Sequence, residues 1–458
     1  MMAVIYSAWR REEQARAEAE EVLRKEPTYS LEMFRKGLFF KDPATVNRIL
    51  TFARKAGLPE TPPLPLPDKP SIAVLPFVNM SEDPKQEYFS DGITENIIST
   101  LSHSPNLFVI ARNSTFTYKG KSVDVRKVGR ELGARYVLEG SVQKTGERIR
   151  ITAQLIDAKS GNHLWSECYD RDLKDIFALQ DEITLKIMVG LGVELGDTGR
   201  SLYKGINNLE VWKKFVQASQ YLSRINKEGN VLARKKAEEI IALDPHIAGV
   251  YVLIGYSHIW DLWFGTSTNP HVSFEKATEA ARKAITLDDN NSDAHCVLCF
   301  ISLARREHEK AIAEAKRAIA LNPNHADAYN ILGLSLFFSD RPVESIGFLK
   351  KAIRLNPFPR SIYLVNLGNA YCATGQYEEA IESFKKGIKR EPDNIFAHIG
   401  LTATYSLMGR EKEAHEAALE VLKIDPEFSL KKLAKTMPFK NQDRLKRSIE
   451  ALRKAGLK

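Results

Sequence analysis

Apolar residues in the second half of the chain recur at helical spacing, in runs that each close at a proline. Pro323, Pro357, Pro392 and Pro426 follow one another at intervals of about 34 residues, behind runs such as AIALNP and AIRLNP. Proline ends a helix because it has no backbone N–H and clashes with the preceding turn. The pattern therefore predicts pairs of helices that repeat with a fixed period.

Small and aromatic residues hold fixed places within each period. In the clearest unit, Leu367 and Gly368 are followed by Tyr371, Ala380 and Phe384. Small residues let two antiparallel helices approach closely, and the aromatic side chains fill the space beside them. This period and spacing are those of the tetratricopeptide repeat. We count six units over residues 208–427, which predicts a right-handed α-helical solenoid, followed by a basic helical cap over residues 428–458.

The opening of the chain repeats its end. Residues 11–57 align without a gap with residues 410–456, so that Ala15 falls on Ala414. A single repeat cannot bury its own faces. Residues 1–58 are therefore expected to form a partial tetratricopeptide unit and a helical cap, which closed an earlier array in a polypeptide or ancestor that extended upstream. The alternative is a self-contained helical extension that docks on the next domain.

A proline-rich stretch covers residues 59–70, within the sequence LPETPPLPLPDKPS. Proline at this density favours extended polyproline II backbone and removes hydrogen-bond donors. A ligand for a proline-binding domain is one interpretation. A linker between two folded units is the one that we favour.

The periodicity changes to that of an α/β domain over residues 71–200. Short apolar runs, IAVLPF and LFVIAR, are separated by the amphipathic helix EYFSDGITENIISTLSHS. DVRKVGRELG predicts a helix that closes at Gly133. RYVLEGSVQKTGERIRITAQLID predicts two strands around a Thr-Gly turn, NHLWSECYDRD extends the sheet, and the helix DIFALQDEITLKIMVGLGVEL follows. The fold class expected here is a mixed-sheet α/β sandwich.

The runs IAVLPFVNMSEDPKQEYFSDGITENIISTLS and YVLEGSVQK resemble the TolB amino-terminal-like domain of bacterial regulatory proteins. In that family the domain commonly follows a class III adenylate cyclase domain or a winged-helix DNA-binding domain, and tetratricopeptide repeats come after it. Neither of those two domains is found before Ile72. The resemblance therefore implies a regulatory or binding module, and it supplies no catalytic residues.

Composition narrows the class of protein. The chain has 458 residues and a formal net charge of +8, but much of this excess lies between Lys431 and Lys458, so a nucleic-acid groove is not expected. No apolar run is long enough for a membrane span, and a cytoplasmic protein is expected. The cysteines are scattered, which argues against a disulfide framework. They are Cys168, Cys296, Cys299 and Cys372.

Candidate catalytic residues do not form a recognisable site. Lys121 belongs to a Gly-Lys-Ser triplet, yet Thr115 stands where a phosphate loop needs its leading glycine. Asp91 and Glu95 lie near a helix start, where a capping role is favoured. His163 has no nucleophile motif nearby and is interpreted as a turn residue, and the Cys296 and Cys299 thiols are interpreted as buried small hydrophobes. We expect no enzyme activity, no cofactor and no metal site.

The first helix of each tetratricopeptide unit should line a concave groove, and its exposed positions should face a ligand. These positions predict a groove that is aromatic at its start and lined by amides later, without lysines to clamp a peptide carboxylate. An amphipathic helix or extended apolar segment of another protein is the expected partner, and some of the aromatics could pack between repeats instead. The predicted groove residues are Val252, Tyr256, Ile259, Trp260, Cys296, Phe300, Leu303, Asn330, Leu334, Phe337, Phe338, Asn366 and Asn369.

Two functions remain open at this point. The first is a non-catalytic adaptor or scaffold that binds a partner segment in the groove of its repeats, with a homo-oligomer possible. The second is a regulatory fragment of a bacterial nucleotide cyclase, whose catalytic domain lies upstream or on another chain. The sequence of the polypeptide before Met1 would separate the two.

Overall fold

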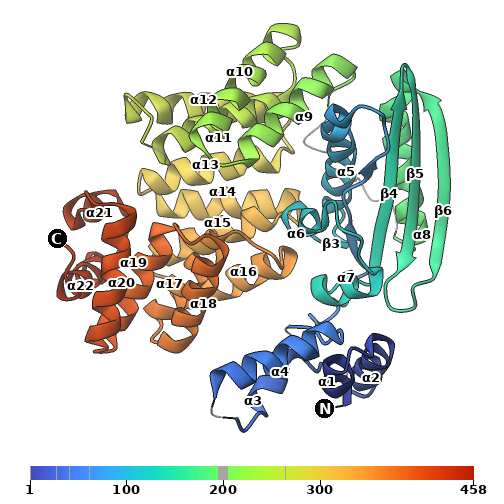
Figure 1. The fold of residues 1–458 in the computed structure, drawn as a ribbon. Coiled ribbons are helices and arrows are strands. Elements are labelled where there is room, and N and C mark those ends of the chain that lie inside the picture. The colour runs from blue at the N-terminus through green and yellow to red at the C-terminus, as the bar shows by residue number, and fades with distance from the viewer. Residues whose placement is uncertain (1, 27, 41, 61, 194–204, 264) are drawn as a thin grey trace.

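The computed structural model describes residues 2–26, 28–40, 42–60, 62–193, 205–263 and 265–458. An N-terminal unit of helices comes first, then a domain built on a β-sheet, and then a long helical array (Figure 1). The N-terminal unit, residues 2–58, consists of α1 (Met2–Ala8), α2 (Glu12–Lys25), α3 (Leu31–Lys36) and α4 (Pro43–Lys55). The end of the sheet domain that the sequence places at residue 200 lies outside the described residues.

The first part of the sheet domain alternates strands and helices. Three long antiparallel strands and a last helix follow. Its strands are β1 (Ser71–Val74), β2 (Val78–Asn79), β3 (Phe108–Val109), β4 (Tyr136–Thr145), β5 (Arg148–Asp157) and β6 (His163–Asp172). Its α-helices are α5 (Glu87–Ser102), α6 (Arg112–Thr115), α7 (Val125–Leu132) and α8 (Ile176–Gly190). The strand order is β3-β1-β4-β5-β6, with β2 also on β4. β1 is parallel to β3 and β4, and β5 is antiparallel to both its neighbours.

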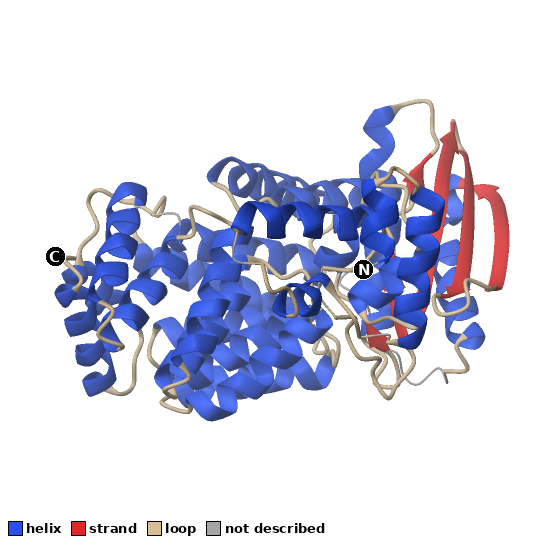
Figure 2. Cartoon of the chain, turned by 60° about the horizontal axis from the view of Figure 1, so that its bottom comes forward, coloured by secondary structure: helices blue, strands red, loops and turns tan. Residues whose placement is uncertain are grey.

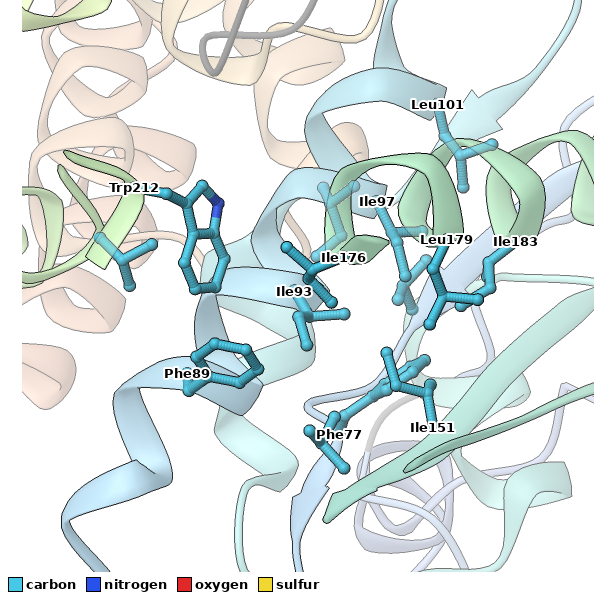
Figure 3. Packing of buried hydrophobic residues seen from close by; sticks show 14 of the residues in the cluster. Phe77, Phe89, Ile93, Ile97, Leu101, Ile151, Ile176, Leu179, Ile183 and Trp212 are labelled. Atoms are coloured by element: carbon cyan, nitrogen blue, oxygen red, sulfur yellow. The ribbon is translucent and has the colours of Figure 1, made fainter. Parts of the chain in front are cut away.

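Both faces of the sheet are covered at β1 and β3, which explains the apolar runs of these early strands. Successive side chains of a strand point to opposite faces. Ile72 and Val74 pack with α5 and α8 in the core that Figure 3 shows. Ala73 and Leu75 pack on the opposite side with α7 and with side chains of the helical array. The mixed-sheet α/β fold expected for this part of the chain is confirmed.

The described residues from 205 to 427 form six pairs of consecutive helices. Figure 2 shows this helical array beside the strands of the sheet domain. The first helices of the pairs are α9 (Leu209–Ser223), α11 (Ala248–Trp263), α13 (Ser292–Ala304), α15 (Ala326–Phe338), α17 (Ser361–Ala373) and α19 (Ile395–Leu407). The second helices are α10 (Lys227–Leu243), α12 (Pro270–Leu287), α14 (His308–Leu321), α16 (Pro342–Leu355), α18 (Tyr377–Arg390) and α20 (Glu411–Ile424). The C-terminal cap, residues 430–458, follows with α21 (Leu430–Thr436) and α22 (Gln442–Lys454).

Close approach at small residues holds each helix pair together, as the sequence predicts. A Cβ atom built on Gly368 would lie 2.7 Å from the ring of Phe384, and one on Gly400 would lie 2.3 Å from the same ring. Phe384 is fully buried between these two first helices. The glycines therefore make room for the aromatic side chain that joins consecutive units.

Two glycines of one unit should respond to alanine in opposite directions. At Gly333 the new Cβ would lie 2.5 Å from Leu349, so Gly333→Ala should lower the free energy of unfolding by about 1–3 kcal/mol. At Gly347, inside α16, nothing lies within 4 Å, so Gly347→Ala should raise it by about 0.5–1 kcal/mol. Urea unfolding of the two variants tests this, and equal effects would contradict the close packing at Gly333.

The sheet domain contacts the array through turns of the array. These turns precede the first helices of the helix pairs. The side-chain amide of Asn324 donates hydrogen bonds of 2.9–3.1 Å to the carbonyl oxygens of Ser102, Ser104 and Leu107, and its oxygen accepts one of 3.2 Å from the Val109 amide. Asn324 is buried. One turn side chain of the array therefore satisfies four backbone groups of the sheet domain.

A second turn of the array and the contact between α5 and α9 extend this interface. Ser114 donates a hydrogen bond of 2.6 Å to the Asn356 side chain, and the Ala111 amide donates one of 2.8 Å to the Leu355 carbonyl. Between α5 and α9, the rings of Phe89 and Trp212 meet edge to face at 4.9 Å (Figure 3). The interface thus combines buried apolar packing with paired backbone groups.

The N-terminal unit and the end of the chain have the same local fold. Helix α4 falls on α22 and α2 falls on α20 when residue 43 is aligned with residue 442. The Leu31 amide donates to the Pro59 carbonyl at 2.7 Å, and the Leu430 amide donates to the Lys458 carbonyl at the same distance. The repeated sequence therefore encodes a repeated structure.

Candidate protein-interaction site

The first helices of the array lie on its inner side. Successive first helices pack directly on one another, α11 on α13, α13 on α15, α15 on α17 and α17 on α19. This packing places them on the inside of the curve, as expected for stacked helix pairs. We use the name hollow for the inner surface that the first helices α11 to α19 form.

The structure divides the predicted groove residues into two groups. Val252, Ile259, Cys296, Leu303, Asn330, Phe337, Phe338 and Asn366 are buried. Tyr256, Trp260, Phe300, Leu334 and Asn369 are half-buried. The second group comes from four successive first helices, and these are the predicted residues that keep partial exposure.

Aromatic side chains line the start of the hollow. Tyr256 and Trp260 stack with ring centroids 6.4 Å apart, and Trp260 meets Trp263 edge to face at 6.1 Å. Trp263 in turn contacts Phe396 of α19, with ring centroids 5.4 Å apart. Trp263 remains 49% exposed. The second unit therefore touches the sixth.

The pattern of single units did not identify Trp263 and Phe396 as site residues. Trp263 is the last residue of the first helix α11, and Phe396 lies in the first turn of the first helix α19. Their contact depends on the curvature summed over four units. The run of three aromatics, Tyr256, Trp260 and Trp263, at helical spacing was the available signal.

The C-terminal cap covers the end of α15. Phe439 packs edge to face against both Phe337 and Phe338, with ring centroids at 5.4 and 4.9 Å, and is itself buried. The Lys440 amide donates a hydrogen bond of 2.9 Å to the Phe338 carbonyl. Helix α22 also packs on α19. The chain itself therefore occupies this part of the surface that the sequence assigned to a partner.

An acidic turn secures the cap. Arg444 forms an ion pair of 2.7 Å with Asp340, and the Asn441 side-chain amide donates a hydrogen bond of 2.8 Å to the same carboxylate. Arg306 donates to the carbonyl oxygens of Lys435 and Met437. The basic residues of the cap are thus partly engaged with the array itself.

Two of the asparagines predicted to line the later part of the groove form a hydrogen bond with each other inside the array. The Asn366 side chain donates a hydrogen bond of 3.1 Å to the side-chain oxygen of Asn330, so these two buried amides satisfy each other. Tyr363 donates one of 2.5 Å to Asp327. Asn369 is the predicted amide that keeps partial exposure.

Cys296 and Asp293 of α13 both lie near His325, the N-cap residue of α15. A cysteine, a histidine and an aspartate in contact could form the site of a catalytic nucleophile. The Cys296 sulfur lies 3.8 Å from His325 Nδ1, and His325 Nε2 lies 3.0 Å from Asp293. However, the Ala328 amide donates to Nδ1 at 2.9 Å, so this nitrogen is engaged in capping α15. Burial also raises the pKa of the Cys296 thiol. The arrangement fits a helix cap better than a catalytic base.

The candidate carboxylates of the sheet domain serve in ion pairs. Asp91 lies in the second turn of α5 and binds Lys119 at 2.6 Å, so the capping role expected for it is wrong. Its other contact, a hydrogen bond of 3.0 Å from Gln220, joins the sheet domain to α9. Glu95 pairs with Arg112 at 3.2 Å. His163, interpreted above as a turn residue, is instead the first residue of β6.

Two kinds of domain match known family models. Residues 68–186 match the second domain of HilA/YgeH-like transcriptional regulators. Residues 303–358 and 361–394 match tetratricopeptide repeats. None of the described helices is long and apolar enough to cross a membrane.

A curated relative matches a large part of the chain. It is named "Putative adenylate cyclase 3" and comes from Rhizobium meliloti (strain 1021). The two are 45% identical over 254 residues, which are 54% of this chain and 43% of the relative. The chain thus spans less than half the length of that protein.

Solved tetratricopeptide structures also align with the array. YrrB, titled a TPR protein with an unusual peptide-binding site, is 18% identical and covers 42% of this chain and 93% of its own, with a TM-score of 0.30. PilW, a type IV pilus biogenesis factor, is 19% identical and covers 46% and 89%, with a TM-score of 0.36. By its family-model matches, this chain is a tetratricopeptide repeat protein with a HilA/YgeH-like domain before its repeats.

Proposed function

We propose that this chain is a non-catalytic interaction module whose hollow takes an apolar segment of another protein. The observation that carries the proposal is the strip Tyr256, Trp260 and Trp263, faced by Phe396 and continued by the half-buried Phe300. Aromatic side chains on rigid helices are the usual anchors of affinity in peptide recognition. The absence of a lysine clamp among the predicted groove residues favours an internal segment over a chain terminus.

Truncation of the central aromatic should reveal the contribution of this strip. In capture from an extract of the host, Trp260→Ala should weaken retention of a native partner by at least about 2 kcal/mol, roughly thirtyfold in Kd. Val231→Ala is the matched control, because Val231 is 65% exposed on a second helix. Unchanged retention by the Trp260 variant, with intact helical circular dichroism, would contradict the proposal.

A second function has a specific observation in its favour. The identity of 45% to a protein named as an adenylate cyclase supports a role as the regulatory part of a nucleotide cyclase, with the catalytic domain upstream or on another chain. Material captured from the host through the chain can be assayed for conversion of ATP to cyclic AMP. Cyclase activity that is lost with Trp260→Ala would join the two functions, whereas a captured partner without cyclase activity leaves the adaptor function alone.

A further inference from the structure

The N-terminal unit presents an aromatic loop whose counterpart is buried elsewhere in the same chain. Phe39 is 99% exposed and Phe40 is 53% exposed. In the alignment of the two repeated segments, Phe40 falls on Phe439, which is 8% exposed. The helices that flank both loops, α3 and α4 against α21 and α22, correspond in order. The chain thus contains the same aromatic loop twice, once buried against the array and once exposed.

The seated copy shows which kind of surface covers such a loop. Phe439 is held by two aromatic residues at the end of a first helix, Phe337 and Phe338, and by contacts to the turn that follows. The N-terminal unit retains α1, which corresponds to the end of α19 and packs on α4 as α19 packs on α22. The described residues of this unit contain no counterpart of α15. The surface that would bury Phe40 must therefore come from elsewhere.

The charges beside the loop discriminate between possible partners. Asn441 and Arg444, which hold the Asp340 carboxylate, are replaced by Asp42 and Thr45 in the N-terminal unit. Asp42 caps α4 by accepting hydrogen bonds from the Thr45 amide and hydroxyl, and these bonds keep its pKa below the usual range. An ionised Asp42 cannot donate to an acidic turn and would repel it.

We propose that the loop with Phe39 and Phe40 docks on the end of a tetratricopeptide array other than the array of residues 208–427. The receiving array carries apolar or aromatic side chains at the end of a first helix. The turn that follows carries a donor, a lysine, arginine or amide, in the place of Asp340. The N-terminal unit then closes that array as the C-terminal cap closes this one, and the proline-rich linker joins the two bodies.

A loop exchange within the full chain tests the recognition step. The C-terminal cap receives the N-terminal sequence through Pro438→Phe, Asn441→Asp, Gln442→Pro, Asp443→Ala, Arg444→Thr and Leu445→Val, in chains with Asp340 or Asp340→Lys. With Asp340, amide hydrogen exchange of α22 should accelerate at least tenfold relative to the parent chain. With Asp340→Lys, it should return to within about threefold of the parent. Equal acceleration in both chains would overturn the proposal. If the variant with six substitutions does not fold, the variant with only Asn441→Asp and Arg444→Thr gives the same comparison.

A mixing experiment tests docking between chains. The probe is a full-length receiver with Phe40→Ala, Phe439→Ala, Leu445→Ala and Asp340→Lys, which opens and recharges the aromatic end of α15. Sedimentation velocity should show association with the parent chain, and association at least tenfold weaker with a Phe40→Ala donor. No association, or equal association with a receiver that keeps Asp340, would overturn the proposal. The second of these results would show that the charge at position 340 does not select the partner.

Discussion

Replacing Asn324 with alanine is expected to separate the unfolding of the sheet domain from that of the array. The change leaves three carbonyl oxygens and the Val109 amide, all at a buried interface, without their partner. Buried polar groups that lose a hydrogen bond cost about 1–3 kcal/mol each, and water can recover part of this. We expect a loss of about 3 kcal/mol or more, seen as two calorimetric transitions in place of one.

The preceding unit of the array offers a matched control for this variant. Asn290 occupies the same place in its turn as Asn324, but its side chain is exposed. Asn290→Ala should therefore change the free energy of unfolding by no more than about 0.5 kcal/mol. Similar calorimetric traces for both variants would show that the turn amides do not couple the two bodies.

Replacing Phe439 with alanine is expected to release the C-terminal cap from the array. The ring is buried against Phe337 and Phe338, and truncation of a buried phenylalanine costs about 3–5 kcal/mol. Because the cap is a terminal element, the loss should appear as local opening before global unfolding. Amide exchange of α22 should accelerate by about two orders of magnitude, while exchange in α17 should change little.

The repeated segment supplies the control for the cap as well. Phe40→Ala removes the same ring from the exposed loop of the N-terminal unit and should leave the thermal midpoint of the chain almost unchanged. A large loss of stability from Phe40→Ala would mean that this ring is covered within the chain. Slow exchange of α22 in the Phe439 variant would mean that the ion pair at Asp340 holds the cap without the ring.

Local pattern was sufficient for the elements and for the architecture. The proline period located the helix pairs, and the places of Gly368 and Phe384 predicted their close contact, because these features act within one or two units. Gly133 adopts a left-handed conformation, with φ of 61°, at the end of α7, as the helix signal indicated. The switch to a sheet domain followed equally from short apolar runs, because strands buried on both faces need them.

The candidate site was less accessible to sequence reasoning because its contacts join distant segments. In the sequence, Asn324 looks like an ordinary turn residue. Its role in joining the two domains depends on backbone groups more than two hundred positions earlier in the chain. Phe337 and Phe338 occupy ligand-facing places within a unit, but the cap that covers them follows three units later. The pairing of Trp263 with Phe396 depends on the accumulated curvature of the array.

Site-specific photo-crosslinking tests most directly whether the hollow takes a partner segment. A benzophenone side chain placed at Leu334, which is half-buried against the same core cluster as Phe300 and Tyr256, should trap one protein in the native host. The same group at Val343, which is 74% exposed on a second helix, should not trap it. A specific adduct at position 334 that disappears with Trp260→Ala is the predicted result. Adducts at position 343 alone, or none at position 334, would contradict the account.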